Sequence, residues 1–551
     1  LTDRAIAWVH AQRAMTPDKP FYLQLCYPAA HSPLQARPKD RDAYRGMYDG
    51  GWDVVRAARL ARQRELGIVP ATTQLPPLSP GADPWDTLDA TQKKIYARYM
   101  EVYAGLITNL DANIGRFLAA LEQAGCRENT LIVLFSDNGG SAEGTPTGTP
   151  NVFAPAFGRP VPVEEAAKLY DVMGEDTTFP HYPIGWACTS NTPYRLYKQY
   201  AHLGGVADPL LISWPKRIAA RGENRDRFVH VVDLYPTILE AAGVTRPEAY
   251  RGRRLKPIEG ASVVATFADA KAPTRTSQYF ELGGQRAYLD GTWRLATKHE
   301  RGAPFENDVW ELYDLASDPN ELVNLADRHP DKVRELKAKW DADAERYGVF
   351  PLDDRNLIIK MVQDRQRRGI RSEWNLTPPL EYLAAPVAPL VCAYGHEIAV
   401  EIVRPPGRGD GVLLAHGSKH AGYVLFVRDG RLVYEQSLVP WNERIEASER
   451  LPDGPLTVRY VQTMTARPFD GTGALFVGDR KIAEHTFARV LLSTSYDGFS
   501  LGADLGNQVS ALYRGPNPFQ GEIVRVRINV DATPSTPIET MRFINAIGIR
   551  V

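Results

Sequence analysis

Residues 131–140 read L-I-V-L-F-S-D-N-G-G, an apolar run that ends on an acid, an amide and two glycines. Five apolar residues bounded by a polar turn predict a strand buried on both faces, which is typical of a parallel sheet. Ligands of open α/β sheets bind at the carboxyl ends of strands, so Asp137 and Asn138 are expected at a binding site. Two adjacent oxygen ligands suit a hard divalent cation, calcium or magnesium. Taken alone, Asp-Asn-Gly-Gly is equally compatible with a plain turn.

Three further segments of the chain accompany this strand end. Residues 21–38 form an apolar run that ends in an H-S-P loop with a second proline after it. Residues 191–215 begin N-T-P-Y-R-L-Y-K and pass through a Gly-Gly pair to a final Trp-Pro, and residues 310–326 read W-E-L-Y-D-L-A-S-D-P-N-E-L-V-N-L-A. Together with S-D-N-G, and in this order, these segments resemble the sulfatase family of the alkaline-phosphatase superfamily over about residues 1–350.

The resemblance implies an alkaline-phosphatase-like, doubly wound α/β sheet and an arylsulfatase-type hydrolase that cleaves sulfate monoesters with a divalent metal. Asp137 and Asn138 match the metal-binding pair of the family, with calcium as the expected ion and magnesium as the alternative. Lys198 matches the lysine that binds a sulfate oxygen near the leaving group. His31 matches the histidine that contacts the ester and protonates the departing oxygen. Cleavage of an anionic ester that expels an oxygen anion needs such cationic and acidic groups.

Three other residues are candidate substrate contacts. Arg195 lies close to Lys198 in the chain and either orients the substrate or pairs with an acid. Residues 141–190 are rich in Pro, Gly and Thr, and a long irregular excursion from the carboxyl end of a strand is usually functional. Within it, His181 and Tyr182 are expected near the substrate, although a hydrogen-bonded loop histidine gives the same pattern.

The nucleophile of the family is not found in this sequence. Relatives carry a C-x-P-S-R motif, whose cysteine becomes formylglycine, and a pair of metal-binding aspartates upstream of the segments quoted above. None of Cys26, Cys126, Cys188 and Cys392 heads that motif, and Cys26 lies in C-Y-P-A-A, which lacks the hydroxyl residue and the arginine. We therefore expect the formylglycine in an N-terminal segment outside this sequence, and an inactive 551-residue chain. His202 is a smaller departure, in a stretch where many relatives place Glu before the Gly-Gly pair.

The composition is that of a large protein with several domains. At 551 residues, of which 44% are hydrophobic, the chain is too long for one core. The formal net charge of -1 argues against nucleic acid as a partner, and no stretch approaches the roughly 20 apolar residues of a membrane span. Four scattered cysteines make no disulfide framework, which slightly favours a cytoplasmic over a periplasmic location, although a signal peptide could precede this sequence. The oligomeric state is not predicted.

Local patterns predict the main elements and three domains. Helical spacing predicts helices over residues 1–14, 92–124, 233–242 and 332–347, a strand is expected over 21–26, and residues 39–94 are expected to be a surface excursion. The predicted domains are a partial sulfatase catalytic α/β domain (1–270), a sulfatase C-terminal α+β subdomain (271–375) and an all-β sandwich (385–551). Short alternating strands with Asp-Gly turns predict the sandwich, which resembles the laminin-G or concanavalin-like module of some large bacterial arylsulfatases.

Two other functions are compatible with these residues. A phosphonate-monoester hydrolase or phosphodiesterase of the same superfamily would share part of the metal and lysine motifs. A non-catalytic, carbohydrate-binding protein would carry the sandwich on a degenerate enzyme core, but the presence of Asp137, Asn138, His31 and Lys198 argues against such decay. The substrate, a small-molecule or a carbohydrate sulfate ester, is not specified by the sequence.

Overall fold

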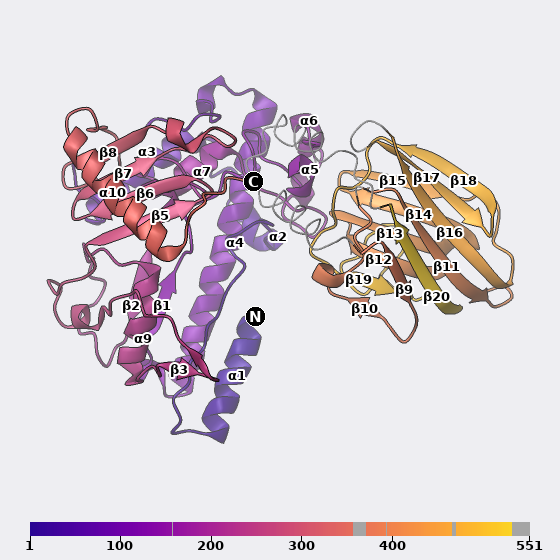
Figure 1. The fold of residues 1–551 in the computed structure, drawn as a ribbon, viewed down its shortest axis with the longest axis horizontal. Helices are drawn as coiled ribbons and strands as arrows, with labels where there is room; N and C mark the ends of the chain where they lie inside the picture. The colour runs from indigo at the N-terminus through magenta and orange to yellow at the C-terminus, as the bar shows by residue number, and fades with distance from the viewer. Residues whose placement is uncertain (157, 356–370, 393, 466–469, 532–551) are drawn as a thin grey trace. The chain divides into compact units, whose positions relative to one another are not determined.

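A computed structural model describes residues 1–156, 158–355, 371–392, 394–465 and 470–531 (Figure 1). The chain divides into two compact units. Unit 1 comprises residues 1–31, 39–147 and 182–355, and unit 2 comprises residues 32–38, 148–181 and 356–551. The three predicted domains stay a prediction, and two loops of the predicted catalytic domain group with the C-terminal part of the chain. In the described part of the chain, no helix combines the length and the apolar character that a membrane span needs.

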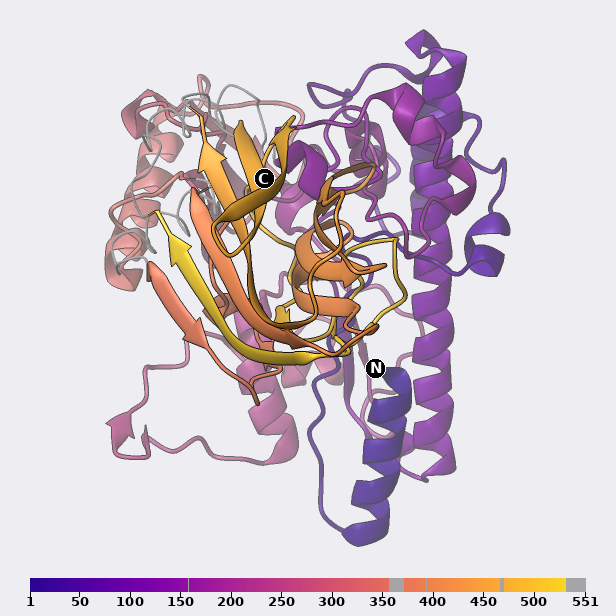
Figure 2. The same ribbon diagram turned by 90° about the vertical axis from the view of Figure 1, so that its right-hand side faces the viewer.

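The helices of unit 1 include one that is 34 residues long. They are α1 (Thr2–Met15), α2 (Pro38–Asp42, which begins in unit 2), α3 (Gly51–Glu65), α4 (Ala90–Gln123), α7 (Ile184–Ser190), α8 (Leu203–Val206), α9 (Leu234–Ala242) and α10 (Pro330–Tyr347). The long helix α4 confirms the helix predicted over 92–124. It starts with a capping box, because Asp89 and Gln92 each accept a hydrogen bond from the backbone N–H of the other. Helix α1 lies alongside α4 (Figures 1 and 2), and an Asp3–Arg116 ion pair joins them.

Residues 39–94 contribute buried side chains to the core of unit 1, so the prediction of a mere surface excursion is wrong for this part of them. Helix α3 packs Trp52 against Trp85 and Trp186, with ring centroids 4.8 and 5.6 Å apart, and all three side chains are buried. A Cβ atom on Gly185 would lie 2.4 Å from the Trp52 ring, so α7 approaches α3 this closely because of its glycine. The Pro- and Gly-rich composition reflects turns, whereas the core aromatics come from separate elements and have no common period.

The apolar run at 131–140 forms an antiparallel ladder instead of a strand in a parallel sheet. Strand β1 (Ile132–Phe135) pairs with β2 (Leu210–Ser213). Leu134 and Phe135 are 40% and 44% exposed, so β1 is not buried on both faces. Every ladder between the described strands is antiparallel. The mixture of helix and sheet is present as predicted, but the doubly wound parallel order is not seen there, because an apolar run does not specify the direction of its partner.

Residues 21–26 were expected to form a strand, and they lie in no ladder of the described strands. Their side chains alternate between partly buried and exposed, as in an extended backbone. An alternating or apolar pattern therefore predicts the extended conformation correctly, but it does not show which segment pairs with it.

A four-stranded antiparallel sheet and helix α10 complete unit 1. The strands β5 (Ser277–Leu282), β6 (Gln285–Asp290), β7 (Trp293–Thr297) and β8 (Trp310–Asp314) lie in sequence order. Their first two turns are the Gly-Gly and Asp-Gly hairpins that the sequence predicts. Helix α10 packs on this sheet (Figure 1), where Leu336 and Trp340 join a buried cluster with Leu295 and Leu312. A two-stranded ladder, β3 (Ala249–Tyr250) with β4 (Arg253–Arg254), lies between α9 and this sheet in the chain.

Unit 2 contains two six-stranded antiparallel sheets in its described residues. One has the order β18-β17-β16-β11-β20-β9 and the other β10-β19-β12-β13-β14-β15; these strands are labelled in Figure 1. The bounds are β9 (Glu373–Leu376), β10 (Tyr382–Leu383), β11 (His396–Arg404), β12 (Gly411–Ser418), β13 (Ala421–Arg428), β14 (Arg431–Leu438), β15 (Trp441–Glu446), β16 (Gly454–Met464), β17 (Gly471–Val477), β18 (Arg480–Phe487), β19 (Phe499–Leu501) and β20 (Glu522–Val530). Both sheets contribute to one apolar core, in which Tyr434 and Tyr460 stack at 3.6 Å.

The loop 148–181 of unit 2 carries the short helices α5 (Phe153–Ala156) and α6 (Val163–Ala167). The side-chain amide of Asn151 donates to the carbonyl oxygens of His420 and Val439 at 2.9 and 2.8 Å, so this loop is fastened to the β13 and β14 region. The likeness of these sheets to a laminin-G module stays a prediction.

Candidate active site

Two aspartates extend from the same end of the β1–β2 ladder. Phe135, the last residue of β1, pairs with Leu210, the first residue of β2. Asp137, just after β1, and Asp208, just before β2, therefore extend from adjacent strand ends. Burial, and secondly the charge of Asp137, raise the pKa of Asp208 to about 7, which places the two carboxylates within electrostatic reach. Sequence analysis missed Asp208, because nothing local shows that the strand after it runs antiparallel beside β1.

The loop after β1 presents oxygen atoms suited to a metal ion. Asp137 is exposed, and the Asn138 side-chain nitrogen donates to the Gly139 carbonyl oxygen at 2.9 Å, which leaves the amide oxygen as the ligand atom. Such donors match calcium or magnesium. Within the described ranges, however, no group of three or more His, Cys, Asp or Glu side chains is placed to hold a metal ion. The residues present therefore fit part of a metal shell.

The loop after β1, residues 136–140, is called the metal loop here after its predicted role, and backbone contacts join it to the segment that carries Lys198. The Gly139 N–H donates to the Gly205 carbonyl at 3.2 Å, and the Lys198 N–H donates to the Gly140 carbonyl at 3.0 Å. A Cβ atom on Gly139 would lie 1.9 Å from the Gly204 oxygen, so only glycine allows this approach. The glycines of S-D-N-G-G thus fix the distance between the oxygen-rich loop and the lysine.

Lys198 and His31 lie side by side in unit 1. The Lys198 Nζ atom is 3.2 Å from Nε2 of His31 and 3.2 Å from Oε1 of Glu143. An ammonium group only donates, so Nε2 of His31 accepts in this contact. The structure brings together two residues that the sequence analysis assigned to one site, although they are far apart in the chain. Sequence analysis marked the excursion 141–190 as functional but missed Glu143 within it.

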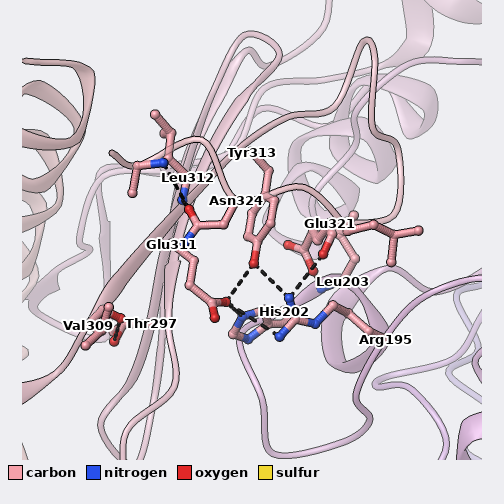
Figure 3. Close-up of polar contacts among 12 residues, drawn as sticks. Arg195, His202, Leu203, Thr297, Val309, Glu311, Leu312, Tyr313, Glu321 and Asn324 are labelled. Atoms are coloured by element: carbon pink, nitrogen blue, oxygen red, sulfur yellow. Dashed lines mark hydrogen bonds and ion pairs between the residues drawn. The ribbon is translucent and has the colours of Figure 1, made fainter. Parts of the chain in front are cut away.

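Arg195 faces protein partners (Figure 3). Its Nη1 donates to the Tyr313 hydroxyl at 2.8 Å and to the Glu321 carbonyl at 3.1 Å, and its Nη2 lies 3.7 Å from Oε2 of Glu311. The geometry thus gives Arg195 the acidic partner that the sequence analysis considered. Its contact with substrate stays a prediction.

His202 is buried and pairs with the same carboxylate (Figure 3). Oε2 of Glu311 lies 2.8 Å from Nε2 of His202 and accepts from the Tyr313 hydroxyl at 2.7 Å. Burial would raise the pKa of Glu311, but hydrogen bonds from His202 and Tyr313, together with the charges of His202 and Arg195, outweigh it and lower the pKa to about 2. Glu311 is therefore ionised and holds His202 through Nε2, while Nδ1 of His202 is buried without a hydrogen-bond partner among the described residues.

A second buried carboxylate fastens the residues after Lys198. Oε2 of Glu321 accepts from the Leu203 N–H at 2.9 Å, and Oε1 accepts from Nε of Arg294 at 2.7 Å. Arg294, on β7, also donates to the Ala201 carbonyl. The segment that carries Lys198 is consequently held by the four-stranded sheet on one side and by the metal loop on the other.

His181 and Tyr182 are both buried. The Tyr182 hydroxyl accepts from the Ser141 N–H at 3.3 Å, and its ring packs edge-on against Tyr103 with centroids 5.2 Å apart, so Tyr182 supports the loop after the metal motif. His181 belongs to unit 2, where its backbone forms a two-way bridge with Thr149. A contact of either side chain with substrate stays a prediction.

Comparison with known proteins assigns the chain to a family. The family described as "Sulfatase" matches residues 1–244, and the one described as "N-sulphoglucosamine sulphohydrolase, C-terminal" matches residues 195–345. An uncharacterised sulfatase of Schizosaccharomyces pombe is 35% identical over 338 residues, covering 61% of this chain and 59% of the relative. Residues 1–345 of this chain therefore belong to the sulfatase family.

A further curated relative and a solved structure are also similar to this chain. An arylsulfatase of Klebsiella aerogenes is 32% identical over 273 residues, which cover 49% of this chain and 56% of that protein. The chain therefore spans a little more than half the length of these two curated sulfatases. The crystal structure of Ps i-CgsB aligns at 18% identity with a TM-score of 0.39, over 67% of this chain and 59% of that one. This structural likeness is too low to add to the sequence match.

The Glu311 network predicts an acid-sensitive stability of this sulfatase. Because folding lowers the pKa of Glu311 to about 2, its contribution is full above the pKa of an unfolded glutamate, about 4.5, and is lost as pH falls toward 2. We expect Glu311→Gln to remove on the order of 2 kcal/mol at neutral pH and to flatten this acid limb. Urea unfolding followed by circular dichroism between pH 7 and about 3 measures both effects. An unchanged acid limb in the variant would contradict the assignment.

Proposed function

We propose that this sulfatase hydrolyses sulfate monoesters with a divalent metal, calcium in the first place, and a formylglycine nucleophile. The contact between Lys198 and His31, next to the Asp137-Asn138 loop, carries the proposal. It joins a fixed positive charge, a proton carrier and hard oxygen ligands at one end of a sheet. The alternative of a degenerate core is not favoured, because these groups keep a mutual geometry that a site without function would not need.

Each side chain has a part in the cleavage of the ester. Lys198 binds a sulfate oxygen and offsets the negative charge that grows toward the leaving oxygen. Once Lys198 has turned from Nε2 of His31 to the sulfate, that nitrogen can carry a proton and pass it to the leaving oxygen. Imidazole groups ordinarily titrate near the pH at which such transfer is efficient. Asp137 and Asn138 would hold calcium, which when bound supplies positive charge that polarises the sulfate oxygens. Asp208, next to Asp137, adds a further oxygen donor at the same end of the ladder.

Calcium binding tests the metal part of the proposal without any need for turnover. We expect the protein to bind calcium weakly in titration calorimetry, because two or three oxygen donors are fewer than the six to eight that calcium takes. Asp137→Ala should abolish the binding heat, since it removes the charged ligand. Asp331→Ala is the matched control, because this carboxylate is 89% exposed on α10. Equal calcium affinity of wild type and Asp137→Ala would refute the site.

The four cysteines allow a test of the nucleophile. None of Cys26, Cys126, Cys188 and Cys392 stands in C-x-P-S-R, Cys188 is buried, and Cys392 belongs to unit 2. We propose that none of them becomes formylglycine, and we expect the purified 551-residue chain to release no 4-nitrophenol from 4-nitrophenyl sulfate. Hydrolysis that depends on Lys198 would show that the nucleophile lies within these residues.

The proton transfer is tested by a series of leaving groups, in an active form of the protein that carries the nucleophile motif. Lys198→Ala should lower kcat about a hundredfold or more with every ester, the scale of losing one charge-stabilising group. His31→Ala should be most harmful with alkyl or sugar sulfates, because poor leaving groups need a proton and nitrophenolate does not. Equal losses across the series would rule out the acid role of His31. Faster turnover of a phosphonate monoester than of any sulfate ester would favour the other reaction of the superfamily.

A further inference from the structure

A glutamate outside the sequence motifs quoted above, Glu143, lies against the lysine of the proposed site. Oε1 and Oε2 of Glu143 are 3.2 and 3.3 Å from Nζ of Lys198. The carboxylate is held on both sides, since Oε1 accepts from the Gln199 side chain at 3.3 Å and Oε2 accepts from the Ser141 hydroxyl at 3.1 Å. The Ser141 hydroxyl in turn accepts from the Glu143 N–H at 3.2 Å. This arrangement places a negative charge at a defined point beside the ammonium group.

The pair is open to a competing anion. The side chains of Lys198 and Glu143 are 20% and 22% exposed, so solvent reaches both, and the pair lies between a fully buried and a fully solvated one. Pairs of this kind contribute little to stability, because water and salt weaken the attraction. A carboxylate and the oxygens of a tetrahedral anion are acceptors for the same ammonium protons. An anion that binds Lys198 must therefore displace the Glu143 carboxylate or bind next to its negative charge.

We propose that Glu143 is the resident counter-ion of Lys198 and that it selects singly charged sulfate esters against doubly charged phosphate monoesters. The proposal rests on the assignment of Lys198 as the anion-binding lysine and adds the specificity of that site. A carboxylate next to the bound anion repels it in proportion to the charge of the anion. The repulsion of a dianion is about twice that of a singly charged sulfate monoester at the same position. Glu143 lowers the affinity for both classes and lowers it more for the dianion.

Two aryl anions without a leaving group test this selectivity by binding alone. Benzenesulfonate is a monoanion, and phenylphosphonate is a dianion at alkaline pH with nearly the same shape. Binding to the 551-residue protein is measured by titration calorimetry with calcium present and at low salt. Glu143→Gln should tighten benzenesulfonate about threefold and phenylphosphonate roughly tenfold, because one unit of repulsion is removed in the first case and two in the second. Added salt should shrink both gains.

Two further variants separate the possible failures. Glu335→Gln removes the same charge from a lysine pair on α10, Lys332–Glu335, and should leave both affinities unchanged. Lys198→Ala should abolish binding of both anions. If Lys198→Ala binds like wild type, the proposed function loses its anion site. If Lys198→Ala fails to bind but Glu143→Gln binds both anions equally or more weakly, the counter-ion role is overturned and the lysine site stands. Should Glu143→Gln not reach the wild-type circular dichroism spectrum, Glu143→Ser is measured against the same criteria.

Discussion

The approach of Gly139 to the Gly204-Gly205 pair is the contact on which the geometry of the site depends. The metal loop follows β1 and the lysine precedes β2, so the two groups come from separate segments of the chain. Two backbone hydrogen bonds, from Gly139 to Gly205 and from Lys198 to Gly140, set their spacing. Because a Cβ atom on Gly139 would overlap the Gly204 oxygen, any side chain there would push the lysine segment away from the oxygen ligands.

The other side of the lysine segment is fixed by charge. The Glu321 carboxylate accepts hydrogen bonds from the Leu203 N–H and from Arg294. The Glu311 carboxylate is hydrogen-bonded to His202 and Tyr313. These contacts come from β7, β8 and the loop after β8, so the segment 310–326 is joined to the segment that carries Lys198. The backbone around Lys198 is thus held from two directions, and its side chain stays partly exposed. If Lys198 binds the anion as proposed, such support would place its ammonium group accurately.

What the sequence could predict was decided by whether a feature is local. The end of the apolar run placed Asp137 and Asn138 in a loop, and the motif order placed His31 and Lys198 in one site, where the structure has them 3.2 Å apart at Nε2 and Nζ. The parallel direction of β1 was wrong, since local burial patterns carry no information on strand partners. Asp208 and Glu143 were missed for the same reason. Asp208 lies near Asp137, and Glu143 lies against Lys198, in each case because distant segments of the chain meet. In the sequence alone, an isolated Asp or Glu in a loop is usually a solvated residue.

Burial distinguishes the ion pairs of unit 1 by what each can do. In the Arg294–Glu321 pair, the side chains are 1% and 0% exposed, so removing one partner would leave a buried, unpaired charge. No ligand can reach this pair to take the place of either partner. Lys332 and Glu335, on α10, are 24% and 45% exposed. Solvent weakens their attraction, so the pair contributes little to stability. The Lys198–Glu143 pair lies between these limits. Under the proposed function, this intermediate exposure would let a sulfate oxygen replace Glu143 at Lys198. The return of Glu143 as sulfate leaves would then keep the lysine paired with a negative charge, which is the property that neither the buried nor the solvated pair offers.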